Sequence, residues 1–480
     1  MRAQQQVHRR RRAITVWSRQ QQQHRACFSA PCALSCLQAR RRLPEVAWRG
    51  AGGSFETLGI SRRGLCIATD TSAQIAGAAP LGLGNDMLRH IAEHSQQPFS
   101  KYSLEDLLRL QEFSPEERVL HLDSVLHVGI SKIVLLLQDL PLGFATHGPM
   151  REVIQDYVQD LRDLRRNPPE DPARFQECIL AIFARHRGML GQIARGLREF
   201  QQEISESFLP VADLKMTRLA DIYATVPAVQ KIERTLDEFF TIRTTLRLLI
   251  AHCLQLNPED PNTSEIGHAM HELMQRIPNS GGAEMPQVRQ VGAICLDTRP
   301  SLILIEAYRH AQFMCRRRFD KDPPELMVNG MPAREFLAAG FDTHVDNHFP
   351  YVDIHLYFVF FEVLKNALLT SMRKAGPDAE CKPIHASLIS GTSLNAENER
   401  TVKITDHGEG ISREDMRKVW SYFHSTTKTK DPREQESAGF STSGGRGLGL
   451  AVSRVLVRYF GGEIDLHSIP RKGTDVYIYL

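Results

Sequence analysis

The chain has 480 residues, of which 42% are apolar and 24% charged, a composition typical of a globular protein with room for two or three domains. The net charge of +3 is uneven, because residues 1–50 hold eleven Arg, no Lys and one acid and so carry +10, which leaves 3 − 10 = −7 for the other 430. An acidic body argues against a nucleic-acid-binding protein, and the sequence excludes a membrane span because its most apolar stretch, residues 355–370, is interrupted by Glu362, Lys365 and Asn366.

The first segment, residues 1–64, is rich in Arg, contains Ser and Gln and is almost free of acidic residues. These features are typical of an organellar transit peptide, and they predict import into mitochondria. Import into a chloroplast is a second interpretation. A disordered basic tail that binds an acidic surface is a third.

Residues 86–256 have apolar side chains at spacings of three and four, which is the pattern of amphipathic helices. Prolines mark the connections at Pro141, Pro168, Pro169 and Pro258. Several long helices with short connections predict an antiparallel bundle of about four helices.

Residues 257–287 are rich in Pro, Asn, Gly and Ser, and we interpret them as a linker or an insertion. From residue 288 to residue 480, strand-like alternation, as at Val402 and Ile404, is interspersed with helical stretches at 302–319, 355–372 and 448–459. This pattern predicts an α/β sandwich with helices on one face of a mixed sheet.

The helix expected at 355–372 carries Glu362, Lys365 and Asn366 at i, i+3 and i+4, so that one face presents a carboxylate, an ammonium and an amide. An amide oxygen suits Mg²⁺, and a carboxylate can accept a proton from an attacking hydroxyl. Taken alone, these residues would be interpreted as a solvated polar face.

A base pocket is predicted from two segments that border strands. Asp406 follows a strand and is itself followed by Gly408 and Gly410, which allow a close approach of backbone to a ligand. The Asp carboxylate can accept from an amino group, and the Thr474 hydroxyl at the start of the last strand can complete the pocket.

A glycine-rich segment opens the helix expected at 448–459. It contains Gly445, Arg446, Gly447, Leu448, Gly449 and Leu450. Free N–H groups and the positive end of the helix dipole make such a segment an anion site. The polar stretch before it, residues 425–443, has the composition of a mobile lid.

Four segments, taken in chain order, resemble the N, G1, G2 and G3 boxes of the GHKL ATP-binding fold. They are residues 362–366, 406–410, 445–450 and the start of the last strand at Thr474. Residues 239–252 are also similar to the last bundle helix of the mitochondrial 2-oxoacid dehydrogenase kinases. Residues 362–367, 422–427 and 473–477 resemble segments of the same kinases. The resemblance covers roughly residues 86–480 and implies an α + α/β fold: an all-α four-helix bundle followed by a GHKL sandwich.

The resemblance also implies roles for single residues. Glu362 would be the general base and a nucleotide contact, Lys365 a nucleotide contact, Asn366 the Mg²⁺ ligand and Asp406 the adenine anchor. The remaining ATP contacts implied are Gly408, Gly410, Ser425, Thr426, Gly445, Arg446, Gly447, Leu448, Gly449, Leu450 and Thr474.

The implied reaction is MgATP-dependent phosphorylation of a serine on the E1α subunit of a mitochondrial 2-oxoacid dehydrogenase, which switches that complex off in the matrix. The family resemblance also implies an E2 lipoyl domain bound by the bundle, and a homodimer. Pyruvate-type members have His where this chain has Phe358, Arg where it has Leu369, and a C-terminal tail beyond the last strand. The absent tail and Phe358 favour the branched-chain type.

Two alternatives stay open. The first is an autokinase of the histidine-kinase type with His271 as acceptor, since His271 is followed by Glu272 and the glycine segment resembles that class. The second is a pseudokinase scaffold that binds nucleotide only. The retention of both Glu362 and Asn366 argues against it, because binding alone needs no base.

Overall fold

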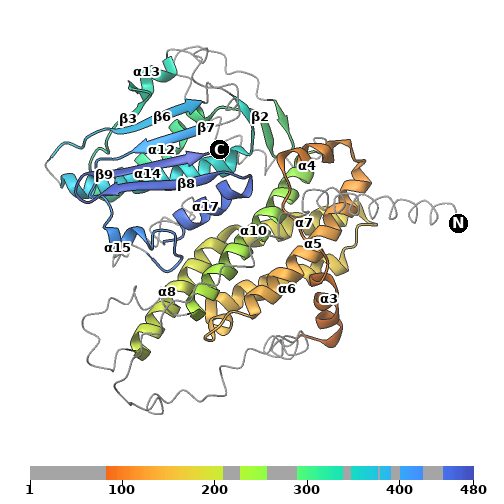
Figure 1. The fold of residues 1–480 in the computed structure, drawn as a ribbon. Helices are drawn as coiled ribbons and strands as arrows, with labels where there is room; N and C mark the ends of the chain where they lie inside the picture. The colour runs from red at the N-terminus through yellow and green to blue at the C-terminus, as the bar shows by residue number, and fades with distance from the viewer. Residues whose placement is uncertain are drawn as a thin grey trace, which may run out of the picture. The chain divides into compact units, whose positions relative to one another are not determined.

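The structure is a computed structural model that describes residues 83–208, 227–256, 289–338, 348–376, 379–390, 400–424 and 447–480 (Figure 1). All of these residues belong to one compact unit, which starts at Gln74. The expected transit segment at 1–64, the linker at 257–287, the lid at 425–443 and His271 lie outside the described residues.

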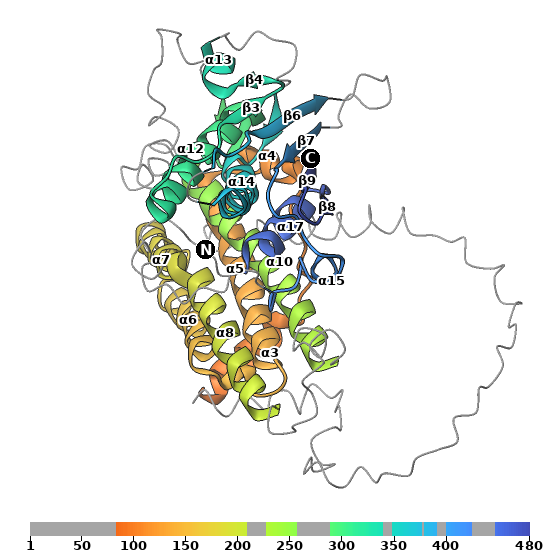
Figure 2. The same ribbon diagram turned by 90° about the vertical axis from the view of Figure 1, so that its left-hand side faces the viewer.

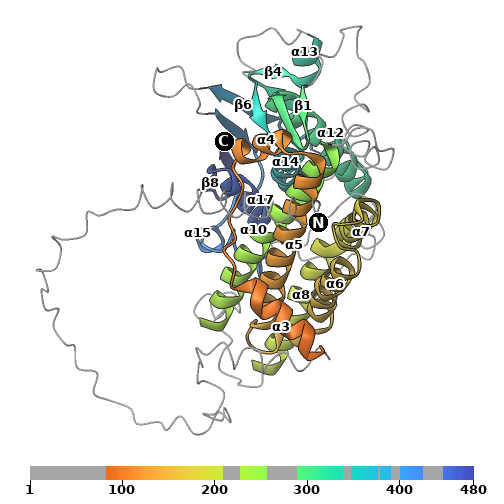
Figure 3. The same cartoon turned by 90° about the vertical axis from the view of Figure 1, so that its right-hand side faces the viewer.

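The N-terminal part of the described chain is helical. Its elements are α3 (Asn85–Ser95), α4 (Leu104–Arg109), η4 (Leu110–Glu112), α5 (Pro115–Gln138), η5 (Phe144–Thr146), α6 (Gly148–Arg166), α7 (Pro172–Arg185), η6 (His186–Gly188), α8 (Met189–Phe208) and α10 (Pro227–Gln255). The start of α5 is a capping box, because the Ser114 hydroxyl accepts from the Glu117 N–H while the Glu117 carboxylate accepts from the Ser114 N–H. The four long helices, α5, α6, α8 and α10, run side by side (Figures 2 and 3).

Helix α5 corrects one expectation from the sequence. It is the single helix among the described residues that is long and apolar enough to cross a membrane, with mean hydropathy 1.6 over its most apolar 18 residues. The stretch 355–370 is therefore not the most apolar part of the chain. Helix α5 contacts α3, α6 and α10, and 56% of its apolar window is buried, as in the core helix of a bundle.

The C-terminal part is an α/β layer structure. Its elements are β1 (Gln290–Val291), β2 (Ile294–Thr298), α12 (Pro300–Phe319), β3 (Leu326–Val328), β4 (Met331–Pro332), α13 (Ala333–Ala338), β5 (Phe349–Tyr351), α14 (Asp353–Ala375), β6 (Ile384–Ser390), β7 (Arg400–Thr405), α15 (Arg413–Met416), α17 (Gly449–Tyr459), β8 (Glu463–Ile469) and β9 (Gly473–Tyr479). Six strands form a mixed sheet in the order β4-β3-β6-β7-β9-β8, in which only β3 and β6 pair in parallel. Strands β1, β2 and β5 form a small second sheet. The predicted fold class, helical bundle followed by α/β sandwich, is confirmed.

Alternation along the strands gives the six-stranded sheet two different faces. Val402, Ile404, Val476 and Ile478 are buried beneath α12, α14 and α17, which contact this sheet (Figure 1). The opposite face, which we call the outer face, carries Lys403, Asp475, Tyr477 and Tyr479 together with Ile389. Tyr479 is 41% exposed and Ile389 is 50% exposed, so the outer face has apolar surface open to solvent.

Contacts from α10 reach the α/β part just ahead of the expected lid. The Tyr422 hydroxyl donates to Asp237 Oδ1 at 2.6 Å, and its ring stacks on Phe240 with centroids 5.6 Å apart. Ser421 donates to Glu233 of the same helix. Burial and the adjacent Asp237 raise the pKa of Tyr422, so the phenol stays protonated as the donor.

Candidate nucleotide site

Helix α14 positions most of the predicted site residues. Its buried stripe anchors it to the sheet and to α12 and consists of Leu356, Val359, Phe360, Val363, Leu364, Ala367 and Leu368. Glu362, Asn366, Thr370 and Lys374 follow one another at intervals of four, so they form a row along one side of the helix. We call these four residues the α14 ridge.

The first ridge residue, Glu362, is buried with a cation beside it. Its Oε2 accepts from Lys365 Nζ at 2.6 Å, and the two residues are 2% and 3% exposed. A solvated polar face is therefore ruled out. Removing one partner of a buried ion pair is strongly destabilising, so Lys365 holds Glu362 in place.

The start of α17 lies directly against this carboxylate. A Cβ added to Gly449 would overlap Glu362 Oε2. Gly447 has φ +81°, a left-handed conformation that favours glycine. The predicted base Glu362 thus lies against Gly449, which belongs to the predicted phosphate segment from Gly447 to Leu450.

Asn366 is the second ridge residue and the predicted metal ligand. It is partly exposed, and within the part of the chain described here no hydrogen bond is formed by its side-chain amide. It lies one helical turn from Glu362. A free amide oxygen beside a carboxylate and a predicted phosphate-binding helix end fits Mg²⁺, which takes few protein ligands and completes its shell with phosphates and water.

Asp406 forms the other end of the site. Its Oδ1 accepts from the N–H of Gly408 at 2.7 Å and from the N–H of Thr474 at 3.3 Å, so the predicted G1 and G3 residues meet on one carboxylate. Burial raises the pKa of Asp406 to about 6, although these two hydrogen bonds act in the opposite direction. A Cβ on Gly408 would meet Thr370 of the α14 ridge.

Two glycines permit this close packing. Gly410 has φ +68°, and a Cβ there would overlap the carbonyl oxygen of Ile469. Gly473 has φ +141°, and a Cβ there would overlap the carbonyl oxygen of Asp406. The Thr474 hydroxyl lies 2.9 Å from Ser468 Oγ, and its backbone N–H rather than its hydroxyl contacts Asp406.

Four predicted contacts, Ser425, Thr426, Gly445 and Arg446, lie outside the described residues. The structure brings the others together at two places on one helix: Glu362, Lys365 and Gly449 at one end, and Asp406, Gly408 and Thr474 at the other. Asn366 is on the ridge between them. The roles assigned to these residues stay predictions.

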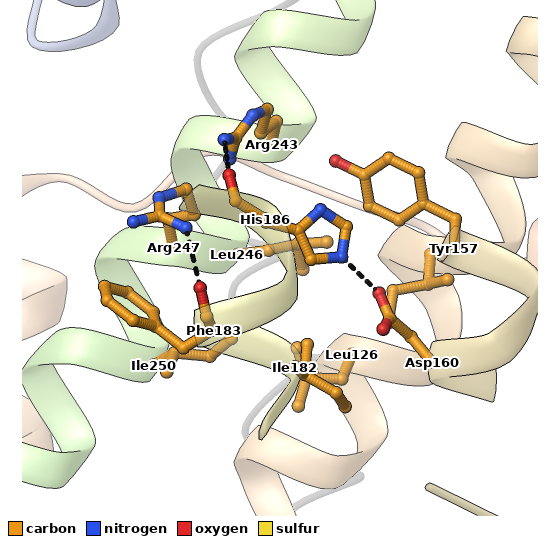
Figure 4. A pocket seen from close by; sticks show the side chains of 11 residues that line it. Leu126, Tyr157, Asp160, Ile182, Phe183, His186, Arg243, Leu246, Arg247 and Ile250 are labelled. Atoms are coloured by element: carbon orange, nitrogen blue, oxygen red, sulfur yellow. Dashed lines mark hydrogen bonds and ion pairs between the residues drawn. The ribbon is translucent and has the colours of Figure 1, made fainter. Parts of the chain in front are cut away.

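A cavity in the helical bundle was not predicted from the sequence (Figure 4). It is lined by Leu126, Ile130, Tyr157, Asp160, Ile182, Phe183, His186, Arg243, Leu246, Arg247 and Ile250. Arg243 donates to the His186 carbonyl at 3.1 Å, and Arg247 lies 3.5 Å from the Phe183 carbonyl with its guanidinium 4.0 Å from that ring. Burial, helped by the neighbouring charge of Arg243, lowers the pKa of Arg247 to about 9.

The two arginines that α10 contributes to this cavity have no carboxylate partner in its lining. Asp160, the acid in the lining, accepts from His186 Nε2 at 2.5 Å and from Arg185, so it is already paired. Arg243 and Arg247 are bound to backbone carbonyls. The sequence signal was a pair of Arg residues one helical turn apart in an otherwise apolar stretch.

Known families match both parts of the chain. Residues 352–480 match the histidine kinase-, DNA gyrase B- and HSP90-like ATPases. Residues 101–295 match the family described as mitochondrial branched-chain alpha-ketoacid dehydrogenase kinase. The two matches cover the α/β part and the helical bundle respectively.

Relatives with established names are similar over most of the chain. A mitochondrial [pyruvate dehydrogenase (acetyl-transferring)] kinase of Arabidopsis thaliana is 25% identical over 403 residues, which is 82% of this chain and 89% of the relative. Isozyme 1 of this kinase from Mus musculus is 24% identical over 88% of this chain and 87% of its own. The enzyme of Schizosaccharomyces pombe is 29% identical over 52% of this chain and 50% of its own. The chain therefore belongs to the mitochondrial 2-oxoacid dehydrogenase kinases, a family of protein kinases in the GHKL superfamily.

Proposed function

We propose that this protein is a MgATP-dependent protein-serine kinase that phosphorylates and inactivates the E1α subunit of a 2-oxoacid dehydrogenase in the mitochondrial matrix. The observation that carries the proposal is the buried Glu362 carboxylate, held by Lys365 against the first turn of α17. A protein that only bound nucleotide would have no use for a carboxylate at the phosphate end of its site.

Each group has a defined task in this proposal. Glu362 orients the substrate hydroxyl and accepts its proton. The N–H groups at the start of α17 bind the phosphates, with Ser425, Thr426, Gly445 and Arg446 as further contacts. Asn366 would hold Mg²⁺, which neutralises the charge of the phosphates when it is bound. Asp406 accepts from the adenine amino group, and the pocket around it includes Gly408, Gly410 and Thr474.

The partners belong to the same proposal. The branched-chain dehydrogenase is the favoured substrate complex because of Phe358, and the pyruvate complex is the alternative. We place the E2 lipoyl domain on the bundle of residues 86–256 and the kinase chemistry in residues 288–480, joined by the segment 257–287. The outer face, with its exposed Tyr479 and Ile389, supports a homodimer formed through the sheets.

A phosphoryl-transfer assay tests this function. The full chain is mixed with ATP labelled on its γ-phosphate, with E2, and separately with pyruvate and branched-chain E1. We expect acid-stable label on one E1α, and a rate of labelling at least ~100-fold lower with Glu362→Gln. Acid-labile label on the chain itself, lost in His271→Ala, would instead identify an autokinase. Nucleotide binding without transfer to either E1 would identify a pseudokinase.

The raised pKa of Asp406 predicts a pH dependence of nucleotide binding. Only the ionised carboxylate accepts fully from the adenine amino group, and its pKa in the free protein is about 6. Affinity for ADP should therefore be constant from pH 7 to 8 and fall below pH 6, approaching about tenfold per pH unit. Calorimetric titration between pH 5 and 8 measures this dependence.

The matched control is Asp406→Asn, which has no titrating carboxyl at this position. The phosphates of ADP also titrate near pH 6, and they do so equally in both proteins. The ratio of the two dissociation constants therefore isolates Asp406. A ratio that stays flat from pH 5 to 8 would exclude Asp406 as the adenine anchor.

A further inference from the structure

The last residue of the α14 ridge, Lys374, binds three backbone carbonyl groups at once. Its Nζ donates to the carbonyl oxygens of His407 at 2.7 Å, Gly408 at 3.0 Å and Arg471 at 2.9 Å. An ammonium group has three N–H donors, so this arrangement uses all of them. The side chain of Lys374 is exposed, and its ammonium covers the outside of the loop that follows β7.

The first of these carbonyls belongs to the peptide unit that holds Asp406. The carbonyl of His407 and the N–H of Gly408 are parts of one trans peptide and point in opposite directions. The carbonyl is bound to Lys374, while the N–H donates to Asp406 Oδ1 at 2.7 Å. A rotation of this peptide would break both bonds together, so Lys374 fixes the donor that orients the carboxylate.

The third carbonyl joins the loop to the turn between β8 and β9. Arg471, in the left-handed region with φ +65°, donates its N–H to the Glu409 carbonyl at 2.5 Å and offers its own carbonyl to Lys374. The next strand supplies Thr474, whose N–H is the second donor to Asp406 Oδ1. Both backbone donors to Asp406 therefore lie on segments that Lys374 ties to the end of α14.

We propose that Lys374 is a positioning residue that sets the direction of the Asp406 carboxylate and, through it, the preference for a purine with a 6-amino group. This inference rests on the proposed function, since it assigns Asp406 to the base. In this proposal Lys374 acts through Asp406 and not through a contact of its own with the nucleotide. Its effect is confined to the hydrogen bond between Asp406 and the amino group.

The test compares two nucleotides that differ only in that amino group. Dissociation constants of ADP and of the diphosphate of purine riboside, which lacks the 6-amino group, are measured by calorimetry with Mg²⁺ on the full chain and on Lys374→Met. Loss of a well-oriented charged hydrogen bond should weaken ADP binding about 10-fold. Binding of the purine riboside diphosphate should change by less than about 2-fold, because it makes no such bond.

The matched control is Lys321→Met. Lys321 also caps backbone carbonyls after α14, those of Gly376 and Ala379, and the same charge is removed, but it does not contact the 406–410 loop. Both dissociation constants should stay at their native values in this variant. A general effect of removing a lysine charge that caps backbone carbonyls near the end of α14 would therefore appear in both variants.

Three outcomes would overturn the inference. An equal loss for both nucleotides in Lys374→Met would mean that Lys374 only stabilises the loop, and unchanged binding of both would mean that it has no positioning role. If the unaltered chain bound neither nucleotide, the proposed function itself would fail, and the inference would fail with it. Thermal melting of each variant, followed by circular dichroism, confirms that the compared proteins are folded.

Discussion

Replacement of Glu362 by Gln is expected to lower the rate of phosphoryl transfer at least ~100-fold while nucleotide affinity stays within about 2-fold of the native value. Gln has the shape of Glu, and its amide oxygen can still accept from Lys365, which donates at 2.6 Å. The variant keeps the packing against Gly449 and loses only the ability to take a proton from the substrate hydroxyl. Turnover on E1α and calorimetric titration with ADP measure the two quantities separately.

The same change alters a buried ion pair, so stability needs its own control. We expect Glu362→Gln to lower the free energy of unfolding by about 1–3 kcal/mol, because Lys365 loses the charge of its partner. Glu306→Gln is the matched variant. Glu306 is a buried acid on α12, which packs on α14, and its contacts with Arg309 and His310 lie outside the site. It should lose stability in urea titration without a comparable loss of turnover.

One outcome for Glu362→Gln would contradict its assignment as the base. If nucleotide binding and turnover fell by the same factor, Glu362 would be a binding group and the base would have to be another residue. A similar loss of turnover in Glu306→Gln would attribute the effect to destabilisation.

Asn366→Ala is expected to weaken ADP binding in Mg²⁺ by ~100-fold or more, since the only predicted protein ligand of the metal is removed. Binding in EDTA should be the same in both proteins, because no metal is present to be lost. The large difference between Mg²⁺ and EDTA in the native chain should therefore disappear in Asn366→Ala. The measurement is calorimetric titration of ADP under the two conditions.

Ser371→Ala controls for a general effect on α14. Ser371 is buried on the same helix and away from the ridge, and its hydroxyl has no partner among the described residues. The difference in ADP affinity between Mg²⁺ and EDTA should be the same in Ser371→Ala as in the native chain. If Asn366→Ala kept the native dependence too, the metal would be held by other groups.

Local patterns in the sequence predicted the elements of this fold well. The helices expected at 302–319, 355–372 and 448–459 are α12 at Pro300–Phe319, α14 at Asp353–Ala375 and α17 at Gly449–Tyr459. Apolar spacing within a segment decides these elements, and it can be read from the segment itself. The four motifs that resemble the GHKL boxes could also be located along the sequence, because glycines and polar residues at element ends are local features.

Local sequence patterns could not predict which distant segments would cover a given side chain. The spacing put Glu362 and Lys365 on one face, but Glu362 is covered by Gly449, which comes from a distant segment. The bundle cavity is lined from α5, α6, α7 and α10, so no one segment contains its pattern. The role of Lys374 was also missed, because its three partners lie in two loops that only the folded chain brings together.

The position of β9 has a consequence for how the protein is made. This strand follows every other strand along the described chain, yet it lies inside the sheet between β7 and β8. During synthesis, β7 and β8 are present before the strand that joins them, and each has an open hydrogen-bonding edge. We therefore expect the newborn kinase domain to depend on chaperones until residue 479 is free to pair, and a chain stopped before Gly473 to aggregate.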